Sequence, residues 1–104
     1  MISLNHYREF GDEKAPSVKD FFNDAPYYGK EVIINYMENG KVVVATTSYG
    51  IDCVTSEKVG IRKEILTDGE YTWSNMLIYY VKKYNMLLPS EFMEKVISLY
   101  EGAQ

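Results

Sequence analysis

Apolar side chains recur every three or four positions in three stretches of the chain, a spacing typical of helices that bury one face. These stretches are residues 30–39, 75–85 and 90–101. Gly40 and Gly102 follow the first and the last of them, and glycine often stands where a helix ends. The pattern therefore predicts one amphipathic helix in the first half of the chain and two near its end.

A shorter helix is predicted ahead of these, over residues 18–23. Ser17 and Asp20 stand three positions apart, and side chains at that spacing can satisfy the free amides of a first helical turn. Residues 1–16 are polar and show no sustained period. We expect them to form an N-terminal arm, either flexible or docked on the body, ahead of a single domain over 17–104.

The stretch between the helices is rich in β-branched residues and alternates apolar with polar positions, which predicts an antiparallel meander of three to four strands. The strands are expected at 41–48, 51–55, 60–66 and 70–73. Asp68 and Gly69 are typical of a hairpin turn. With two helices before the sheet and two after it, the predicted fold class is α+β.

Tyrosine and tryptophan are concentrated between residues 68 and 89. Tyr71, Trp73, Tyr80 and Tyr84 are expected in the core, because a tyrosine fills volume and keeps its hydroxyl near water. Tyr79 falls among lysines on the polar side of its helix, so it is a candidate contact residue. On the last helix, Phe92, Val96, Leu99 and Tyr100 are expected to form the apolar side.

The chain has 104 residues and a formal net charge of −4. Nucleic-acid-binding domains usually carry a basic footprint, so nucleic acid is a disfavoured partner. The acidity suits a protein that stays in solution or meets a basic partner. A single cysteine, Cys53, and the lack of a signal-peptide pattern favour the reducing cytoplasm. No apolar run approaches the roughly 20 residues that cross a bilayer, so no membrane contact is expected.

Few residues of the chain point to catalysis. His6 is the only histidine and lies in the expected arm, so neither a catalytic triad nor a two-histidine metal site is predicted. Cys53 has Asp52 beside it, which opposes formation of a reactive thiolate; a half-buried strand cysteine is the simpler interpretation. No catalytic residue, cofactor or metal ligand is predicted, and a small hydrolase or thiol enzyme is the least favoured alternative.

Residues 68–92 contain the string D-G-x-Y-x-W followed by Y-Y-V-x-K-Y-N-x-x-L-P-x-x-F. The string is made of Asp68, Gly69, Tyr71, Trp73, Tyr79, Tyr80, Val81, Lys83, Tyr84, Asn85, Leu88, Pro89 and Phe92. It resembles a pattern in small bacterial proteins that have no assigned function, and the resemblance extends over residues 31–95. The resemblance implies one compact domain and brings no activity or ligand with it.

These observations predict a small, non-catalytic, cytoplasmic module that binds another protein, with a basic partner favoured by charge. An immunity- or inhibitor-type binder is one instance of that class. The candidate contact residues are Tyr79, Lys82, Lys83, Glu91, Glu94 and Glu101. The three glutamates lie on the outer side of the last helix.

Two alternatives stay open. A nucleic-acid-associated regulator would use Arg62, Lys63, Lys82 and Lys83 around Tyr79, since a basic stripe with an aromatic ring can hold single strands. A homodimer would hide the edges of the small sheet by pairing them across a two-fold axis.

Overall fold

The computed structural model describes residues 1–102. Within this range the elements are β1 (Ile2–Ser3), the 3-10 helices η1 (Arg8–Phe10) and η2 (Val18–Phe21), α1 (Lys30–Glu38), β2 (Lys41–Ile51), β3 (Lys58–Thr67), β4 (Tyr71–Ser74), α2 (Asn75–Tyr84) and α3 (Ser90–Gly102). The strands form one sheet in the order β1-β4-β3-β2. Because β1 runs parallel to β4 while the other pairs are antiparallel, the sheet is mixed. The α+β class is confirmed.

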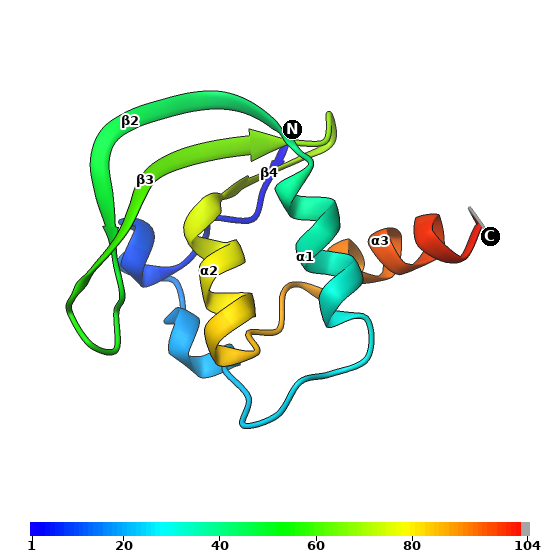
Figure 1. The fold of residues 1–104 in the computed structure, drawn as a ribbon, viewed down its shortest axis with the longest axis horizontal. Helices are drawn as coiled ribbons and strands as arrows, with labels where there is room; N and C mark the ends of the chain where they lie inside the picture. The colour runs from blue at the N-terminus through cyan, green and yellow to red at the C-terminus, as the bar shows by residue number, and fades with distance from the viewer. Residues whose placement is uncertain (103–104) are drawn as a thin grey trace.

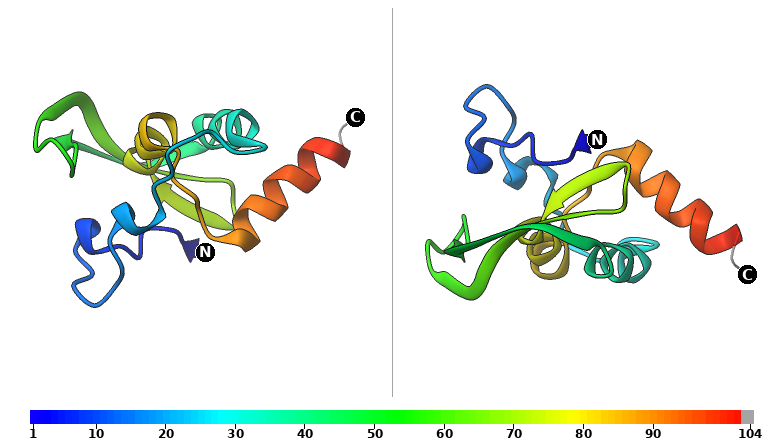
Figure 2. Two further views of the ribbon diagram at one scale, coloured as in Figure 1. Left: turned by 90° about the horizontal axis from the view of Figure 1, so that it is seen from below. Right: turned by 90° about the horizontal axis from the view of Figure 1, so that it is seen from above.

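The helices are distributed unevenly around the sheet. α1 and α2 lie side by side on one face, and the N-terminal segment with its two 3-10 helices crosses the other (Figures 1 and 2). The β2–β3 hairpin extends beyond the helices on one side of the molecule, and α3 points outward on the opposite side. The two ends of the molecule are thus a strand hairpin and a helix end.

The core is centred on Trp73, which is fully buried. Its ring lies 5.5 Å from that of Phe92 and 6.2 Å from that of Tyr36, and its indole N–H donates to the Met37 carbonyl over 3.2 Å. Strand β4, helix α1 and helix α3 therefore meet at this one side chain. The core positions predicted for Tyr71, Trp73 and Tyr80 are confirmed.

The helix predicted over 18–23 is wrong in type and length. Only Val18–Phe21 is helical, and as a 3-10 turn, so one α-helix and not two precedes the antiparallel strands β2–β4. The backbone turns extended at Phe22, and the Phe21 carbonyl accepts a hydrogen bond from the Leu87 amide over 2.8 Å. Pairing with the segment after α2 therefore takes the carbonyl that a longer helix would have used.

The predicted strand over 51–55 is also wrong. β2 runs through to Ile51, and the chain then turns because the Asp52 carboxylate accepts hydrogen bonds from the amides of Val54 and Thr55, at 2.8 and 3.1 Å. An aspartate that binds the amides two and three residues ahead favours a turn over a strand. The meander therefore has three antiparallel strands.

The fourth strand of the sheet lies in the segment set apart as an arm. The amides of Ile2 and Leu4 donate to carbonyls of residues 70 and 72, each over 2.8 Å, and form a short parallel ladder. Leu4 and Tyr7 are buried. Two residues of strand are too few to leave a recognisable alternation in the sequence.

β2 forms one edge of the sheet and is irregular along its length. Its pairing with β3 shifts register between Val42 and Val44, between Ala45 and Tyr49, and again between Tyr49 and Ile51. Bulges of this kind twist a strand and discourage another strand from adding to its edge. The edge is therefore a poor template for pairing with a second copy of the chain, although its valines are exposed.

Candidate functional site

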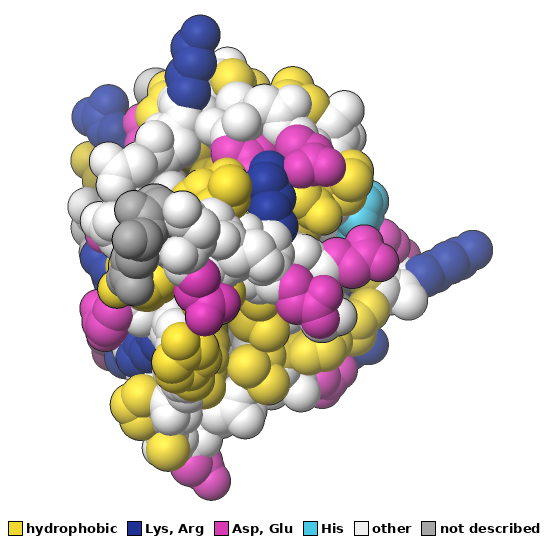
Figure 3. All heavy atoms as spheres, turned by 90° about the vertical axis from the view of Figure 1, so that its right-hand side faces the viewer, with side chains coloured by type: hydrophobic (Ala, Val, Ile, Leu, Met, Phe, Trp, Pro, Cys, Tyr) yellow, Lys and Arg dark blue, Asp and Glu magenta, His cyan; other side chains and the backbone are white. Residues whose placement is uncertain are grey.

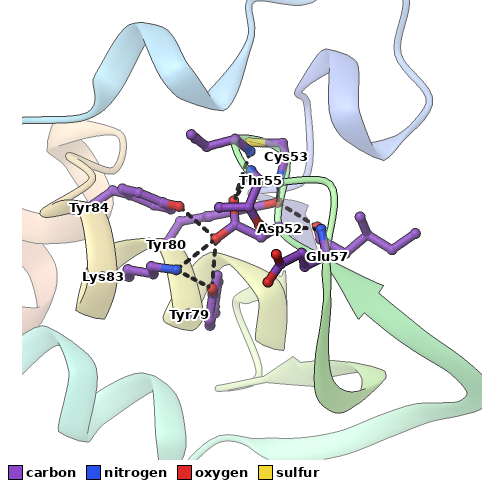
Figure 4. A network of polar contacts seen from close by, with 10 residues as sticks. Asp52, Cys53, Thr55, Glu57, Tyr79, Tyr80, Lys83 and Tyr84 are labelled. Atoms are coloured by element: carbon purple, nitrogen blue, oxygen red, sulfur yellow. Dashed lines mark hydrogen bonds and ion pairs between the residues drawn. The ribbon is translucent and has the colours of Figure 1, made fainter.

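A buried carboxylate organises the polar cluster drawn in Figure 4. Asp52 has no exposed surface. Its Oδ2 accepts hydrogen bonds from the hydroxyls of Tyr79 and Tyr84, at 2.7 and 2.6 Å, and lies 3.3 Å from the ammonium of Lys83. Its Oδ1 accepts the Val54 and Thr55 amides already described. All three side chains around Oδ2 come from α2, so the cluster attaches the β2–β3 turn to that helix.

The pKa values in this cluster follow from its geometry. Burial alone would raise the pKa of Asp52, but hydrogen bonds from Tyr84, Tyr79 and the turn amides outweigh burial and lower the pKa well below its usual range. The pKa of Lys83 is raised by its contacts with the Tyr79 hydroxyl and with Asp52. Asp52 is thus ionised near neutral pH and held in that state.

The cluster is suited to fixing structure rather than to moving protons. A general acid or base works best with a pKa near the working pH and with room for a substrate. Asp52 meets neither condition, since its pKa is lowered and both oxygens are occupied by groups of the same chain. We assign it the role of anchoring the turn at residues 52–57 to α2.

The contact residues predicted on α2 are bonded to other side chains of the same chain. Tyr79 is half-buried, and its hydroxyl donates to Asp52 while accepting from the Lys83 ammonium over 3.2 Å. Lys82 forms an ion pair with Glu38 of α1, over 2.6 Å. Tyr79 and Lys83 are therefore brought together as expected, but around a carboxylate of the same chain.

Lys82, Lys83 and Arg62, which were considered for nucleic-acid binding, also contact other side chains of the same chain. Lys82 and Lys83 each face a carboxylate, whereas Arg62 on β3 lies over the ring of Tyr49, 5.7 Å from its centre. The hollow between β3 and α2 is lined by Glu38 and Glu64 as well as by Lys82. A phosphate backbone would meet as much negative as positive charge there, which opposes binding.

A second aspartate repeats the arrangement at the other end of β3. Asp68 Oδ1 accepts hydrogen bonds from the amides of Glu70 and Tyr71, at 2.9 and 2.7 Å. Its Oδ2 accepts the Tyr36 hydroxyl at 2.5 Å and the Lys95 ammonium at 2.7 Å. Burial opposes ionisation here too, but the bonds from Lys95 and Tyr36 lower the pKa of Asp68. This aspartate ties the β3–β4 turn to α1 and α3.

The outer side of α3 differs from that of α2. Glu91, Glu94 and Glu101 are exposed, and none of them forms an ion pair within residues 1–102. Of the apolar side predicted for this helix, Phe92 and Val96 are buried, but Leu99 and Tyr100 are 52% and 47% exposed. Leu99 and Tyr100, predicted to share the apolar side with Phe92 and Val96, therefore do not join the core, because the end of α3 points away from the body (Figure 1).

Two hollows lie between α3 and the segment before α1, and both border Tyr28, whose surface is 82% exposed. Their volumes are about 510 and 320 Å³, and both are lined by Tyr27, Tyr28 and Ile97. The larger one also reaches Met93, Glu94 and Glu101, and the smaller one Glu31 and Tyr100. We call this surface, with these eight residues, the α3 groove. Figure 3 shows acidic side chains next to hydrophobic ones on this side of the molecule.

The groove is shaped by a close backbone contact. Gly29 precedes α1 with a positive φ of 84°, and a side chain there would collide with Ile97, since its Cβ would lie 2.4 Å from Ile97 Cδ1. The adjacent Tyr27 is fixed by its hydroxyl, which donates to the Met86 carbonyl over 2.7 Å. The backbone on both sides of Tyr28 is thus fixed, while the Tyr28 ring itself is exposed to solvent.

Cys53 and His6, the other residues considered for catalysis or metal binding, lie in different segments of the fold. Cys53 lies in the turn and not in a strand; burial, together with the charges of Glu9 and Asp52, raises the pKa of its thiol, which opposes nucleophilic activity. His6 lies near Asp12 in the N-terminal segment, with 3.9 Å between Nδ1 and Oδ2. Across residues 1–102, no three His, Cys, Asp or Glu side chains are grouped so as to hold a metal ion.

Sequence reasoning missed Asp52 and the α3 groove. The spacing of Asp52 from Val54 and Thr55 signals a turn, but nothing local indicates that three α2 side chains would converge on its other oxygen. The groove depends on Tyr28 and Ile97, which are far apart in the sequence. Only the two hollows of the folded chain, which bring Tyr28 and Ile97 together, reveal it.

Comparisons with protein-family models, with curated proteins and with solved structures found no match to this chain. In the part of the chain that is described, no helix combines the length and the apolar character needed to cross a membrane.

Proposed function

We propose that this protein is a small, non-catalytic interaction module that binds another protein through the outer side of α3. The observation that carries the proposal is the α3 groove, where the exposed Glu94 and Glu101 adjoin the half-buried Met93 and Ile97 and the exposed rings of Tyr28 and Tyr100. Exposed apolar patches that are rimmed by polar residues often mark protein–protein interaction sites.

The charge of the surface favours a basic partner. Glu31, Glu94 and Glu101 line the groove and are exposed. They outnumber Lys30, the one basic residue that lines the two hollows within residues 1–102, whose ammonium donates to the Lys82 carbonyl and to Asn85 Oδ1. A surface of one sign attracts partners of the opposite sign and speeds their association. An immunity- or inhibitor-type role in the cytoplasm of a bacterium fits this description.

Affinity capture from lysate of the source cells tests the proposal. The bait is the intact protein, and the test variant is Glu94→Lys/Glu101→Lys. The matched control is Glu13→Lys/Glu57→Lys, which makes the same change of charge at exposed positions away from α3. A variant of Tyr79 or Lys83 would be a poor choice, because it would disturb the buried Asp52 cluster.

We expect one stoichiometric protein that is retained by the control variant and lost with the α3 variant. Capture of no protein, or of the same protein with both variants, would contradict the proposal. Recovery of nucleic acid instead, in amounts that fall steeply with salt, would favour the regulator alternative.

A further inference from the structure

The surface of α3 that faces the groove has the spacing of a helix-packing seam. Met93, Ile97 and Tyr100 are separated by four and then three positions, which places them on one side of the helix, as the apolar positions of a coiled coil are placed. Met93 and Ile97 are half-buried and Tyr100 is exposed. The seam is therefore covered on one side by residues 27–29 and open on the other.

The acidic residues stand beside this seam at a regular interval. Glu94 and Glu101 each follow a seam residue and lie seven positions apart, which is two helical turns or roughly 10 Å along the axis. In paired helices, charged residues that flank the seam select the partner and its orientation by forming ion pairs across the interface. A matching partner needs two cations at the same interval.

The groove contains no strand of the sheet. Its walls are helix α3, the start of α1 and the segment 26–29, so a partner cannot bind by adding a strand to a sheet edge. Recognition must come from apolar side chains that enter hollows, which is the mode used by amphipathic helices in grooves. The two hollows that border Tyr28 provide two such places.

We infer that the α3 groove binds an amphipathic helix of the partner protein, with apolar side chains seated in the two hollows that border Tyr28 and with lysine or arginine facing Glu94 and Glu101. This inference rests on the proposed function, because it names the kind of segment that the binding surface takes. It differs from that function in specifying one helix, one seam and one sign of charge.

The test uses purified, isotope-labelled protein and synthetic peptides, and so needs no knowledge of the natural partner. The probe is a short peptide of leucine and lysine with leucine at helical spacing. One control peptide has the same composition in an order without that spacing, and a second replaces every lysine by glutamate. Amide chemical shifts report where each peptide binds and how tightly.

We expect the helical leucine–lysine peptide to shift amides of residues 27–33 and 93–101 and to bind more tightly than either control. Tyr28→Ala should weaken binding roughly tenfold, as loss of a central aromatic contact does, while Tyr49→Ala, at an exposed tyrosine of the hairpin, should leave it unchanged. Glu94→Gln/Glu101→Gln should reduce the salt dependence of binding, and Glu13→Gln/Glu57→Gln should not.

Equal binding of the reordered peptide, or shifts centred on the β2–β3 hairpin, would overturn the inference. So would equal effects of Tyr28→Ala and Tyr49→Ala. These outcomes are separable from failure of the proposed function: a captured protein that depends on Glu94 and Glu101, together with no response to the helical peptide, would retain the function and reject the helix.

Discussion

The Asp52 cluster and the α3 groove are built from the same kinds of side chain, and the fold treats them in opposite ways. Around Asp52, two tyrosines and a lysine direct their polar groups at one buried carboxylate. In the groove, an almost fully exposed tyrosine stands beside glutamates with no ion pair in residues 1–102. Residue type alone therefore does not mark a contact surface; what matters is whether folding has already supplied the partner.

The largest expected difference in the free energy of unfolding comes from removing one carboxylate in each of the two regions. Asp52→Ala leaves two tyrosine hydroxyls, a lysine and two turn amides without their acceptor, so we expect a loss of about 3–5 kcal/mol in the free energy of unfolding. Glu94→Ala, at an exposed position, should change it by less than about 0.5 kcal/mol. Urea unfolding followed by circular dichroism measures both; similar losses for the two variants would remove the basis of the comparison.

Acid should weaken the two anchors formed by Asp52 and Asp68. The folded pKa values of Asp52 and Asp68 are lowered, whereas an aspartate in the unfolded chain titrates near about 4. Each anchor therefore contributes its stability above about pH 4 and loses it as the pH falls below that value, by on the order of 2 kcal/mol per carboxylate.

The pH dependence can be assigned by substitution. Asp52→Asn should lower stability at neutral pH and flatten its decline in acid, as seen from urea midpoints measured across the acid range. Asp24 is exposed and its side chain makes no hydrogen bond within residues 1–102, so Asp24→Asn should keep the wild-type profile. An unchanged slope in Asp52→Asn would show that this carboxylate does not drive the acid transition.

Two residues of the predicted apolar side of α3 should differ sharply in the stability that is lost when each is replaced by alanine. Val96→Ala opens space in the core and should cost about 2 kcal/mol, because Val96 is 1% exposed. Leu99→Ala should cost less than about 0.5 kcal/mol, because half of its surface is already in water. Thermal unfolding of the two variants checks the pair, and a large loss for Leu99→Ala would mean that the end of α3 is covered.

The smallest expected difference in stability is between variants that each lose one tyrosine hydroxyl. Tyr79→Phe removes a hydrogen bond to a buried carboxylate and should cost about 1 kcal/mol. Tyr28→Phe removes a hydroxyl that bonds to nothing within residues 1–102, so no measurable change in stability is expected. Equal stabilities for the two variants, measured side by side in urea, would mean that water replaces Asp52 as the partner of Tyr79 at no cost.

The helices and the long strands could be predicted because their signals are local. α1, α2 and α3 each have an apolar side at helical spacing, and Asp68-Gly69 marks the turn between β3 and β4. Gly69 adopts a positive φ of 99°, which is the conformation that this turn residue permits. Prediction failed where an element depends on contacts between residues far apart in the sequence. η2 ends because residue 21 pairs with residue 87, and β1 forms only because β4 lies beside it.

The string that spans residues 68–92 can be accounted for by structure at most of its positions. Asp68 anchors a turn, while Tyr71, Trp73, Tyr80, Val81, Leu88 and Phe92 are buried. Tyr79, Lys83 and Tyr84 surround Asp52, and Asn85 ends α2 in a left-handed conformation with φ of 54°. Because Asp52 lies outside the string, the sequence gives no hint that these three polar residues share a target. The pattern therefore describes a fold, and the proposed contacts lie elsewhere.

The parallel ladder between β1 and β4 has a consequence for the order of assembly. Asn5 and Ser74, whose contact extends that ladder, are 69 positions apart in the chain. A strand that leaves the ribosome early must therefore wait until β4 has been synthesised before any of its backbone can pair. β1 joins the sheet after the β2–β3 hairpin can already have closed, so the first strand of the chain is among the last parts of the sheet to form.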